Sequence, residues 1–201
     1  MTLKALRMTF NPEKHHRRSI RLKGYDYGQP GAYYVTICTA NHQCSFGEIH
    51  AGETQLSPLG EIVQEEWLRS AEMRRRVTLD AFVVMPNHLH GIIILGDLDE
   101  TRVSDGGAEL SDVYGRAATR PSTTEQFGKP TTDTIPTIVR LFKSAATKRI
   151  NIQRGTPGAS AWHRNYYEHV VRDLEDLNRI REYITANPAR WADDIQNPNK
   201  L

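Results

Sequence analysis

The stretch from Val83 to Leu95 constrains the fold more narrowly than any other part of the chain. Most of its residues are valine, isoleucine or leucine, a composition that predicts buried β-structure, with a Pro-Asn break near its middle. Side chains alternate between the two faces of a strand, so His88 and His90 are expected to point the same way and Leu89 the opposite way. Two imidazoles on one face of a central strand can bind a divalent metal ion. The alternative is one hydrogen-bonded core histidine beside a second that is there by chance.

The composition predicts a single globular domain without a membrane partner. The chain has 201 residues, of which 38% are hydrophobic, and it contains no run of about 18 apolar residues that could span a bilayer. The N-terminal residues are polar and basic, unlike a secretory signal. Cys38 and Cys44 are too few for a disulfide scaffold, which favours a reducing, cytoplasmic location.

Positive charge is unevenly distributed, although the net charge is only +2. Basic residues cluster in three places, at residues 14–23, 74–76 and 140–149, and tyrosines follow the first cluster. Clustered cations beside aromatic rings suit a phosphate backbone and unstacked bases. The alternative is a set of solvated surface charges.

The predicted elements follow the order strand, helix, strand, strand, helix, strand, helix. They cover residues 32–39, 58–73, 77–84, 88–95, 135–150, 161–172 and 174–187, with a short extra strand around 46–49. Ser57 and Asp173 are expected to cap the first and last helices, and Gly155 to end the middle one. The first six elements match a split β-α-β unit. We therefore predict an α+β fold, a ferredoxin-like sandwich with an antiparallel sheet and helices packed on one face, plus a C-terminal helix carrying Tyr183.

The same patterns predict three regions. Residues 1–29 form a basic N-terminal arm, residues 30–191 form the domain, and residues 192–201 form a tail. Residues 97–134 are rich in glycine, proline, serine and threonine, and we interpret them as a flexible insertion in the domain.

The last predicted helix presents Tyr183 and Asn187 one turn apart on the same face. A phenolate can act as a covalent nucleophile, and the amide oxygen of an asparagine suits a hard cation such as Mg²⁺ or Mn²⁺. The alternative is that Tyr183 is an ordinary helix residue and that Asn187 caps the helix before Pro188.

Six segments of the chain together resemble the REP-associated tyrosine transposases, relatives of the single-tyrosine HUH transposases of insertion sequences. The resemblance runs from about Arg17 to Trp191 and excludes the predicted insertion. Its segments are residues 18–27, 31–39, 84–91, 142–144, 162–172 and 180–188. The His-Leu-His motif is moderately specific alone, but it is strongly specific together with the Tyr183-x-x-x-Asn187-Pro188 helix.

This resemblance implies a metal-dependent transposase. It makes His88, His90 and Asn187 the ligands of a divalent metal, Mg²⁺ or Mn²⁺, and Tyr183 the nucleophile. The tyrosine would attack a phosphodiester of single-stranded DNA, form a 5′-phosphotyrosine link and free a 3′-hydroxyl that can rejoin strands. The expected partner is single-stranded or hairpin DNA carrying a repeated palindrome, bound by a monomer or a homodimer.

The residues expected to contact DNA are basic or aromatic and lie mainly in the arm. They are Arg17, Arg18, Arg21, Lys23 and Tyr25, joined by Lys143 on the middle helix.

Three alternatives stay open. Tyr166 or Tyr167 could be the nucleophile, although neither matches the family position. The same fold could bind or regulate palindromic DNA hairpins without catalysis. A metal-activated water could hydrolyse a substrate without any tyrosine.

Overall fold

The protein is built on a four-stranded antiparallel sheet. Its computed structural model describes residues 22, 24–97 and 133–200. The strands lie in the order β4–β5–β1–β6 and comprise β4 (Val77–Met85), β5 (His88–Leu95), β1 (Gly31–Cys38) and β6 (Tyr167–Val170). This order confirms the predicted split β-α-β unit, with β6 as an edge strand. A separate hairpin pairs β2 (Gly47–His50) with β3 (Glu53–Leu56), and the sequence had predicted only the first of these two strands.

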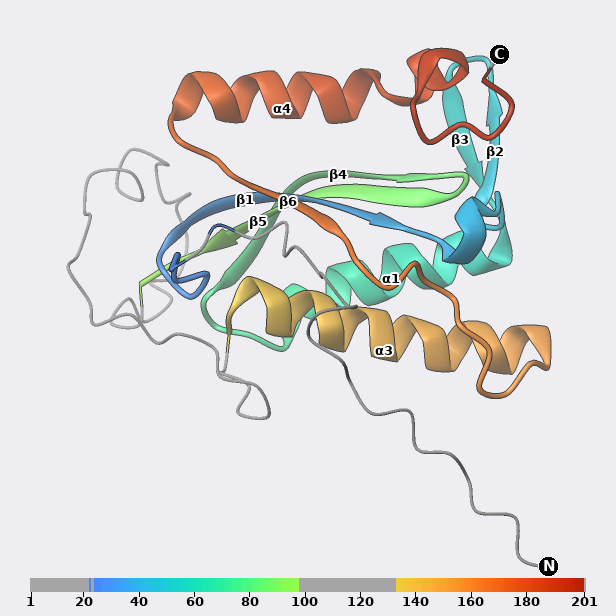
Figure 1. The fold of residues 1–201 in the computed structure, drawn as a ribbon, viewed down its shortest axis with the longest axis horizontal. Helices are drawn as coiled ribbons and strands as arrows, with labels where there is room; N and C mark the ends of the chain where they lie inside the picture. The colour runs from blue at the N-terminus through green and yellow to red at the C-terminus, as the bar shows by residue number, and fades with distance from the viewer. Residues whose placement is uncertain (1–21, 23, 98–132, 201) are drawn as a thin grey trace, which may run out of the picture.

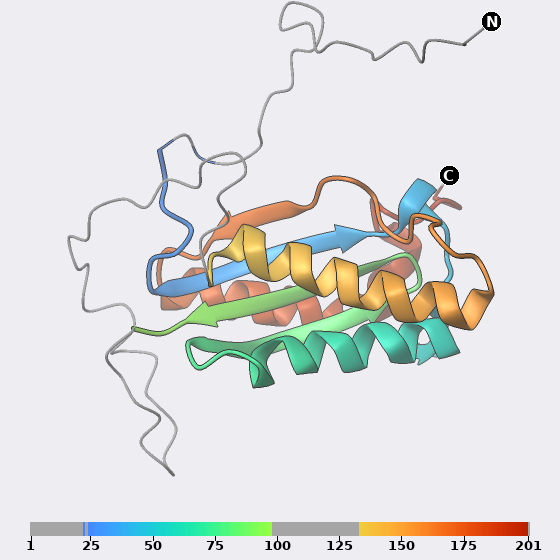
Figure 2. The same cartoon turned by 90° about the horizontal axis from the view of Figure 1, so that it is seen from below.

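Helices cover both faces of the sheet (Figures 1 and 2). Helices α1 (Pro58–Glu72) and α3 (Ile135–Arg154) lie side by side on one face, as predicted. Helix α4 (Leu174–Ala186), the predicted C-terminal helix, lies on the opposite face, a position that the sequence did not predict. The reason is a second apolar cluster, in which Leu177, Ile180 and Ile184 of α4 pack on Tyr34 and Ile92 of the sheet.

Three of the helix ends lie at residues that the sequence predicted as caps. Ser57 Oγ accepts a hydrogen bond from the Gly60 amide at the start of α1, and the Asp173 carboxylate accepts one from the Asp176 amide at the start of α4. Gly155 ends α3 in the left-handed conformation, with φ of 64°. None of the described helices is long and apolar enough to cross a membrane.

Alternate residues of strand β5 point to opposite faces of the sheet, as the sequence predicted. Leu89 and Ile93 are buried in the large core that also contains residues of α1 and α3. Ile92 belongs to the smaller core beneath α4, and the His90 ring contacts Tyr183 of α4. The histidines therefore face α4, and Leu89 and Ile93 hold the opposite face of the strand against the other helices.

Gly91 allows α1 to approach β5 closely. A Cβ atom at this position would lie 2.5 Å from Cζ2 of the Trp67 indole, which is fully buried. We expect Gly91→Ala to lower the free energy of unfolding by about 1–3 kcal/mol, because the ring or the strand must move. Urea denaturation measures the loss. Gly96→Ala is the control, since its nearest neighbour would be a carbonyl oxygen 3.8 Å away; equal losses in the two variants would contradict this packing.

The domain begins before the predicted boundary at residue 30. Tyr27 is buried in the large core, Tyr25 packs against the same core, and the Tyr27 hydroxyl accepts a hydrogen bond from the Leu22 amide at 3.0 Å. Because Tyr25 and Tyr27 pack on the core, these residues belong to the domain and not to the arm that the sequence predicted. The predicted insertion falls almost wholly outside the described residues, as do Arg17, Arg18, Arg21 and Lys23.

Candidate functional site

The imidazoles of His88 and His90 face each other across a short gap. Their Nε2 atoms are 2.9 Å apart and their ring centroids 4.4 Å apart. Both side chains are buried. Two nitrogens bound to one metal ion at about 2.1 Å and a near-right angle would be about 3 Å apart. The pair therefore has the spacing of two ligands of a single ion.

Hydrogen bonds hold both rings with Nε2 turned inward. His88 Nδ1 lies 2.8 Å from Asn87 Oδ1, and the Asn87 amide group donates to the backbone carbonyls of His42 and Gln196. His90 Nδ1 lies 2.7 Å from the Tyr34 hydroxyl and 2.9 Å from the Thr36 hydroxyl. With a proton on each Nδ1, the lone pair of each Nε2 points into the shared space.

Burial keeps both histidines neutral near pH 7. Desolvation lowers the pKa of His88 to about 4, against an opposing effect of the Asp194 carboxylate. Desolvation and the neighbouring His88 lower the pKa of His90 well below its usual value. Neutral imidazole is the form that binds metal ions, so the pair needs no deprotonation before binding.

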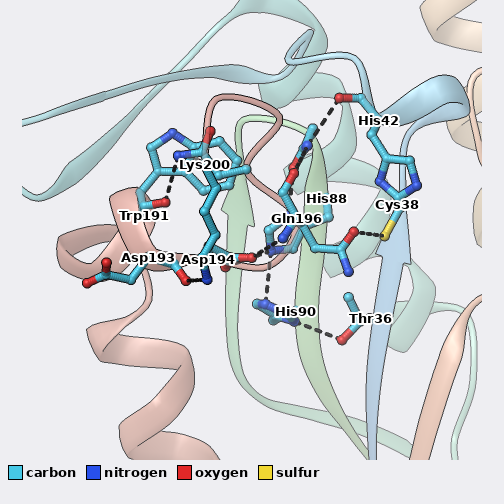
Figure 3. A network of polar contacts seen from close by, with 12 residues as sticks. Thr36, Cys38, His42, His88, His90, Trp191, Asp193, Asp194, Gln196 and Lys200 are labelled. Atoms are coloured by element: carbon cyan, nitrogen blue, oxygen red, sulfur yellow. Dashed lines mark hydrogen bonds and ion pairs between the residues drawn. The ribbon is translucent and has the colours of Figure 1, made fainter.

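Asp194 supplies a carboxylate to this pair, and the sequence analysis missed it. Its ligand oxygen and the two histidine nitrogens all lie within 4.8 Å of one another. Asp194 Oδ2 is buried, 3.8 Å from His88 Nε2, and has no hydrogen-bond partner. The segment after α4, starting with η2 (Pro188–Asp193), brings Asp194 over the histidines (Figure 3).

Asn187 lies at the end of α4 and is buried. Its Oδ1 atom, like Asp194 Oδ2, is buried without a hydrogen-bond partner. A divalent cation would satisfy the Asp194 oxygen and both imidazole nitrogens, so the residues present fit such an ion. The buried His–His–Asp group could bind a metal, whereas the role of Asn187 as a ligand stays a prediction.

Tyr183 of α4 borders the histidine pair. Its ring centroid lies 5.3 Å from that of His90 and 6.3 Å from that of Tyr34, to which it is perpendicular. The side chain is 42% exposed, so it is open to a substrate. Burial raises the pKa of the Tyr183 phenol and the Asp194 charge raises it further, while contacts with Asn187 and Tyr34 act in the opposite direction. The phenol is therefore protonated at neutral pH.

The two rival tyrosines lie on different faces of the sheet, and only Tyr167 borders the same cavity as Tyr183. Tyr166 packs against the large core on the α1 and α3 side. Tyr167 of β6 is 53% exposed and has an edge-on contact with Tyr34, with the ring centroids 6.2 Å apart. Tyr34 touches the Nδ1 side of His90, away from the gap between the two Nε2 atoms.

Asp176 in the first turn of α4 helps to position the helix that carries Tyr183. Its carboxylate accepts hydrogen bonds from His169 at 2.7 Å and from the Arg172 amide at 3.3 Å, and it pairs with Arg179. Burial alone would raise the pKa of Asp176, but these hydrogen bonds outweigh it and lower the pKa from 3.8 to about 2. Further along α4, Arg181 pairs with Asp80 of β4 at 3.0 Å.

Removing the Asp176 charge should destabilise the protein in a pH-dependent way. Because the folded-state pKa lies below the unfolded value, the charge stabilises the fold above pH 3.8 and this contribution is lost as the pH falls towards 2. We expect Asp176→Asn to lower the free energy of unfolding by about 1.5 kcal/mol at pH 7. In urea titrations, the difference in free energy of unfolding between the wild type and the variant should decrease below about pH 4. A difference that stays constant down to pH 2 would show that the Asp176 charge does not stabilise the fold.

Two predicted DNA contacts have structural partners. Lys143 Nζ donates to the carbonyls of His163 at 2.7 Å and Arg164 at 3.2 Å, tying α3 to the segment before β6. The Tyr25 hydroxyl lies 3.4 Å from that of Tyr33, and its ring packs edge-on against Tyr27. Their contact with DNA stays a prediction.

A protein of Haemophilus influenzae, described as uncharacterized, is 40% identical to this chain over 185 residues, which cover 92% of this chain and 95% of that protein. The chain belongs to the same family as that protein. No protein-family model matches the chain.

Among solved structures, a REP-associated tyrosine transposase bound to a REP hairpin superposes with a TM-score of 0.55. The superposition covers 87% of this chain and 74% of the transposase, with 16% sequence identity. At this identity the likeness establishes the fold. It confirms the α+β fold with an antiparallel sheet that the sequence predicted.

Proposed function

We propose that this protein cleaves and rejoins single-stranded or hairpin DNA through a phosphotyrosine intermediate on Tyr183. The observation that supports this most directly is the position of the Tyr183 phenol, 5.3 Å from the His90 ring and beside the buried His–His–Asp group. A side-chain nucleophile beside a metal-binding group is one arrangement that can catalyse phosphoryl transfer.

The proposed reaction conserves the phosphodiester bond energy. The Tyr183 hydroxyl loses its proton to solvent as Oη bonds to the phosphorus. The P–O3′ bond then breaks, and the 3′ oxygen takes up a proton. The DNA remains attached to the enzyme through its 5′-phosphate, and attack by a free 3′-hydroxyl reverses the step and joins the strands.

His88, His90 and Asp194, with Asn187 as a fourth candidate, would hold the cation. A bound Mg²⁺ or Mn²⁺ would neutralise the charge that develops on the scissile phosphate. Asn87 orients His88, while Tyr34 and Thr36 orient His90, so that both Nε2 atoms would be available to a bound cation. The imidazole content suits Mn²⁺ better than Mg²⁺, because nitrogen ligands favour transition metals.

The proposed substrate is DNA with a palindromic hairpin and a single-stranded flank. It rests on the shared fold with a transposase that is bound to a REP hairpin. Arg17, Arg18, Arg21, Lys23, Tyr25 and Lys143 remain the proposed DNA contacts. A monomer or a homodimer is compatible with the proposal.

A denaturing gel tests the function. Hairpin DNA with single-stranded flanks, labelled at its 3′ end so that the label stays with the 5′-phosphate fragment, is incubated with the full chain and Mn²⁺, or with excess EDTA as the control. In Mn²⁺ but not in EDTA, we expect a labelled protein–DNA species that survives denaturation. Treatment with a protease should convert it into a smaller labelled adduct. Cleaved DNA without an adduct would instead indicate a hydrolase, and binding without cleavage would indicate a non-catalytic hairpin-binding module.

A further inference from the structure

We propose that the cavity beside Tyr183 binds one nucleobase adjacent to the scissile phosphate, with Tyr167 as the residue that stacks on it. This inference rests on the proposed function and names a substrate subsite for it. The cavity has a volume of about 750 Å³, within the range of sites that bind small molecules.

The cavity is continuous with the candidate catalytic residues. Its walls include His90, Tyr183 and Asp194, together with Tyr34 and Tyr167 of the sheet. A phosphate held beside Tyr183 and the histidine pair would therefore place its neighbouring nucleoside in or next to this space. A duplex base pair cannot enter such a concave site as readily as one unstacked base, which agrees with a single-stranded substrate.

Strand pairing explains why the aromatic rings gather here. Tyr167 of β6 lies opposite Thr36 of β1, which in turn lies opposite His90 of β5. Directly opposed residues share a face of the sheet, so all three project towards α4. The Tyr34 ring contacts both Tyr167 and Tyr183, at centroid distances of 6.2 Å and 6.3 Å.

The chemistry of the walls suits a base better than a carbohydrate or a peptide. Tyrosine rings offer flat faces on which any base can stack, and Tyr167 is 53% exposed although it borders the cavity. Arg179 also lines the cavity and is largely exposed, and its pairing with Asp176 restricts where it can reach. A guanidinium there can contact the phosphate that follows the base. Ile180 and Ile195 complete the apolar lining.

Binding to two single-stranded probes tests the subsite without requiring cleavage. The probes are a fluorescein-labelled 12-nucleotide oligothymidylate and a 12-unit abasic oligomer with the same phosphates. Dissociation constants are measured by fluorescence anisotropy with EDTA in the buffer. The variants are Tyr167→Ala, Tyr167→Phe, which keeps the ring, and Leu141→Ala, which removes an exposed apolar side chain from α3 on the other face of the sheet.

We expect Tyr167→Ala to weaken oligothymidylate binding by about 5- to 100-fold, the usual cost of losing one base–aromatic stack, and to leave abasic binding unchanged. Tyr167→Phe and Leu141→Ala should bind both probes like the wild type. Equal weakening of both probes, or no weakening of either, would overturn the subsite. EDTA prevents metal-dependent cleavage, so this binding assay is independent of the adduct assay in Mn²⁺. Base binding by Tyr167 can therefore be found without a covalent adduct, and a covalent adduct can be found without base binding by Tyr167.

Discussion

Tyr183→Phe is expected to lower the rate of DNA strand cleavage at least about a thousandfold, because the substitution removes the attacking oxygen and keeps the ring. Single-turnover cleavage of labelled hairpin DNA in Mn²⁺ measures the rate. Affinity for the same DNA should change less than about threefold, since only one partly exposed hydroxyl is lost. Tyr167→Phe is the matched control and should cleave at a rate close to that of the wild type. Substantial cleavage by Tyr183→Phe would favour a water nucleophile.

His90→Ala is expected to weaken Mn²⁺ binding at least about 100-fold, because it removes one of two inward-facing nitrogens from a buried site. Titration calorimetry measures the affinity, and the stabilisation of the fold by added Mn²⁺ should fall in parallel. His50→Ala removes an exposed histidine from the β2–β3 hairpin and should bind Mn²⁺ like the wild type.

Asp194→Asn provides an independent check on the metal site. It keeps the size of the side chain and removes its charge, so the fold should survive while Mn²⁺ affinity falls. Unchanged Mn²⁺ affinity in both His90→Ala and Asp194→Asn would mean that the ion binds elsewhere.

Local patterns predicted most of the fold because each element carries its own signal. The alternation in β5 correctly placed His88 and His90 on one face, and Ser57, Asp173 and Gly155 marked helix ends that the structure contains. The strand β3 was missed because its sequence, Glu-Thr-Gln-Leu, is polar and short; it forms by pairing with β2. The position of α4 was missed because periodicity identifies the apolar stripe of a helix without showing which face of a sheet receives it.

The candidate site was only partly predictable for a related reason. His88, His90 and Tyr183 belong to regular elements with recognisable spacing. Asp194 follows η2, in a segment that the sequence analysis took for a tail, and it reaches the histidines only through the path of the chain after Pro188. The sole signal was weak: Asp193 and Asp194 are the only acidic residues after Pro188.

The most direct test of strand transfer by Tyr183 is to locate the DNA attachment on the protein. The wild-type chain is incubated with hairpin DNA and Mn²⁺, digested with nuclease and trypsin, and sequenced by tandem mass spectrometry. We expect a nucleotide mass on the peptide that contains Tyr183, and on that residue. A nucleotide attached to Tyr167, Tyr166 or Tyr34 instead, or cleaved DNA with no modified peptide, would contradict it.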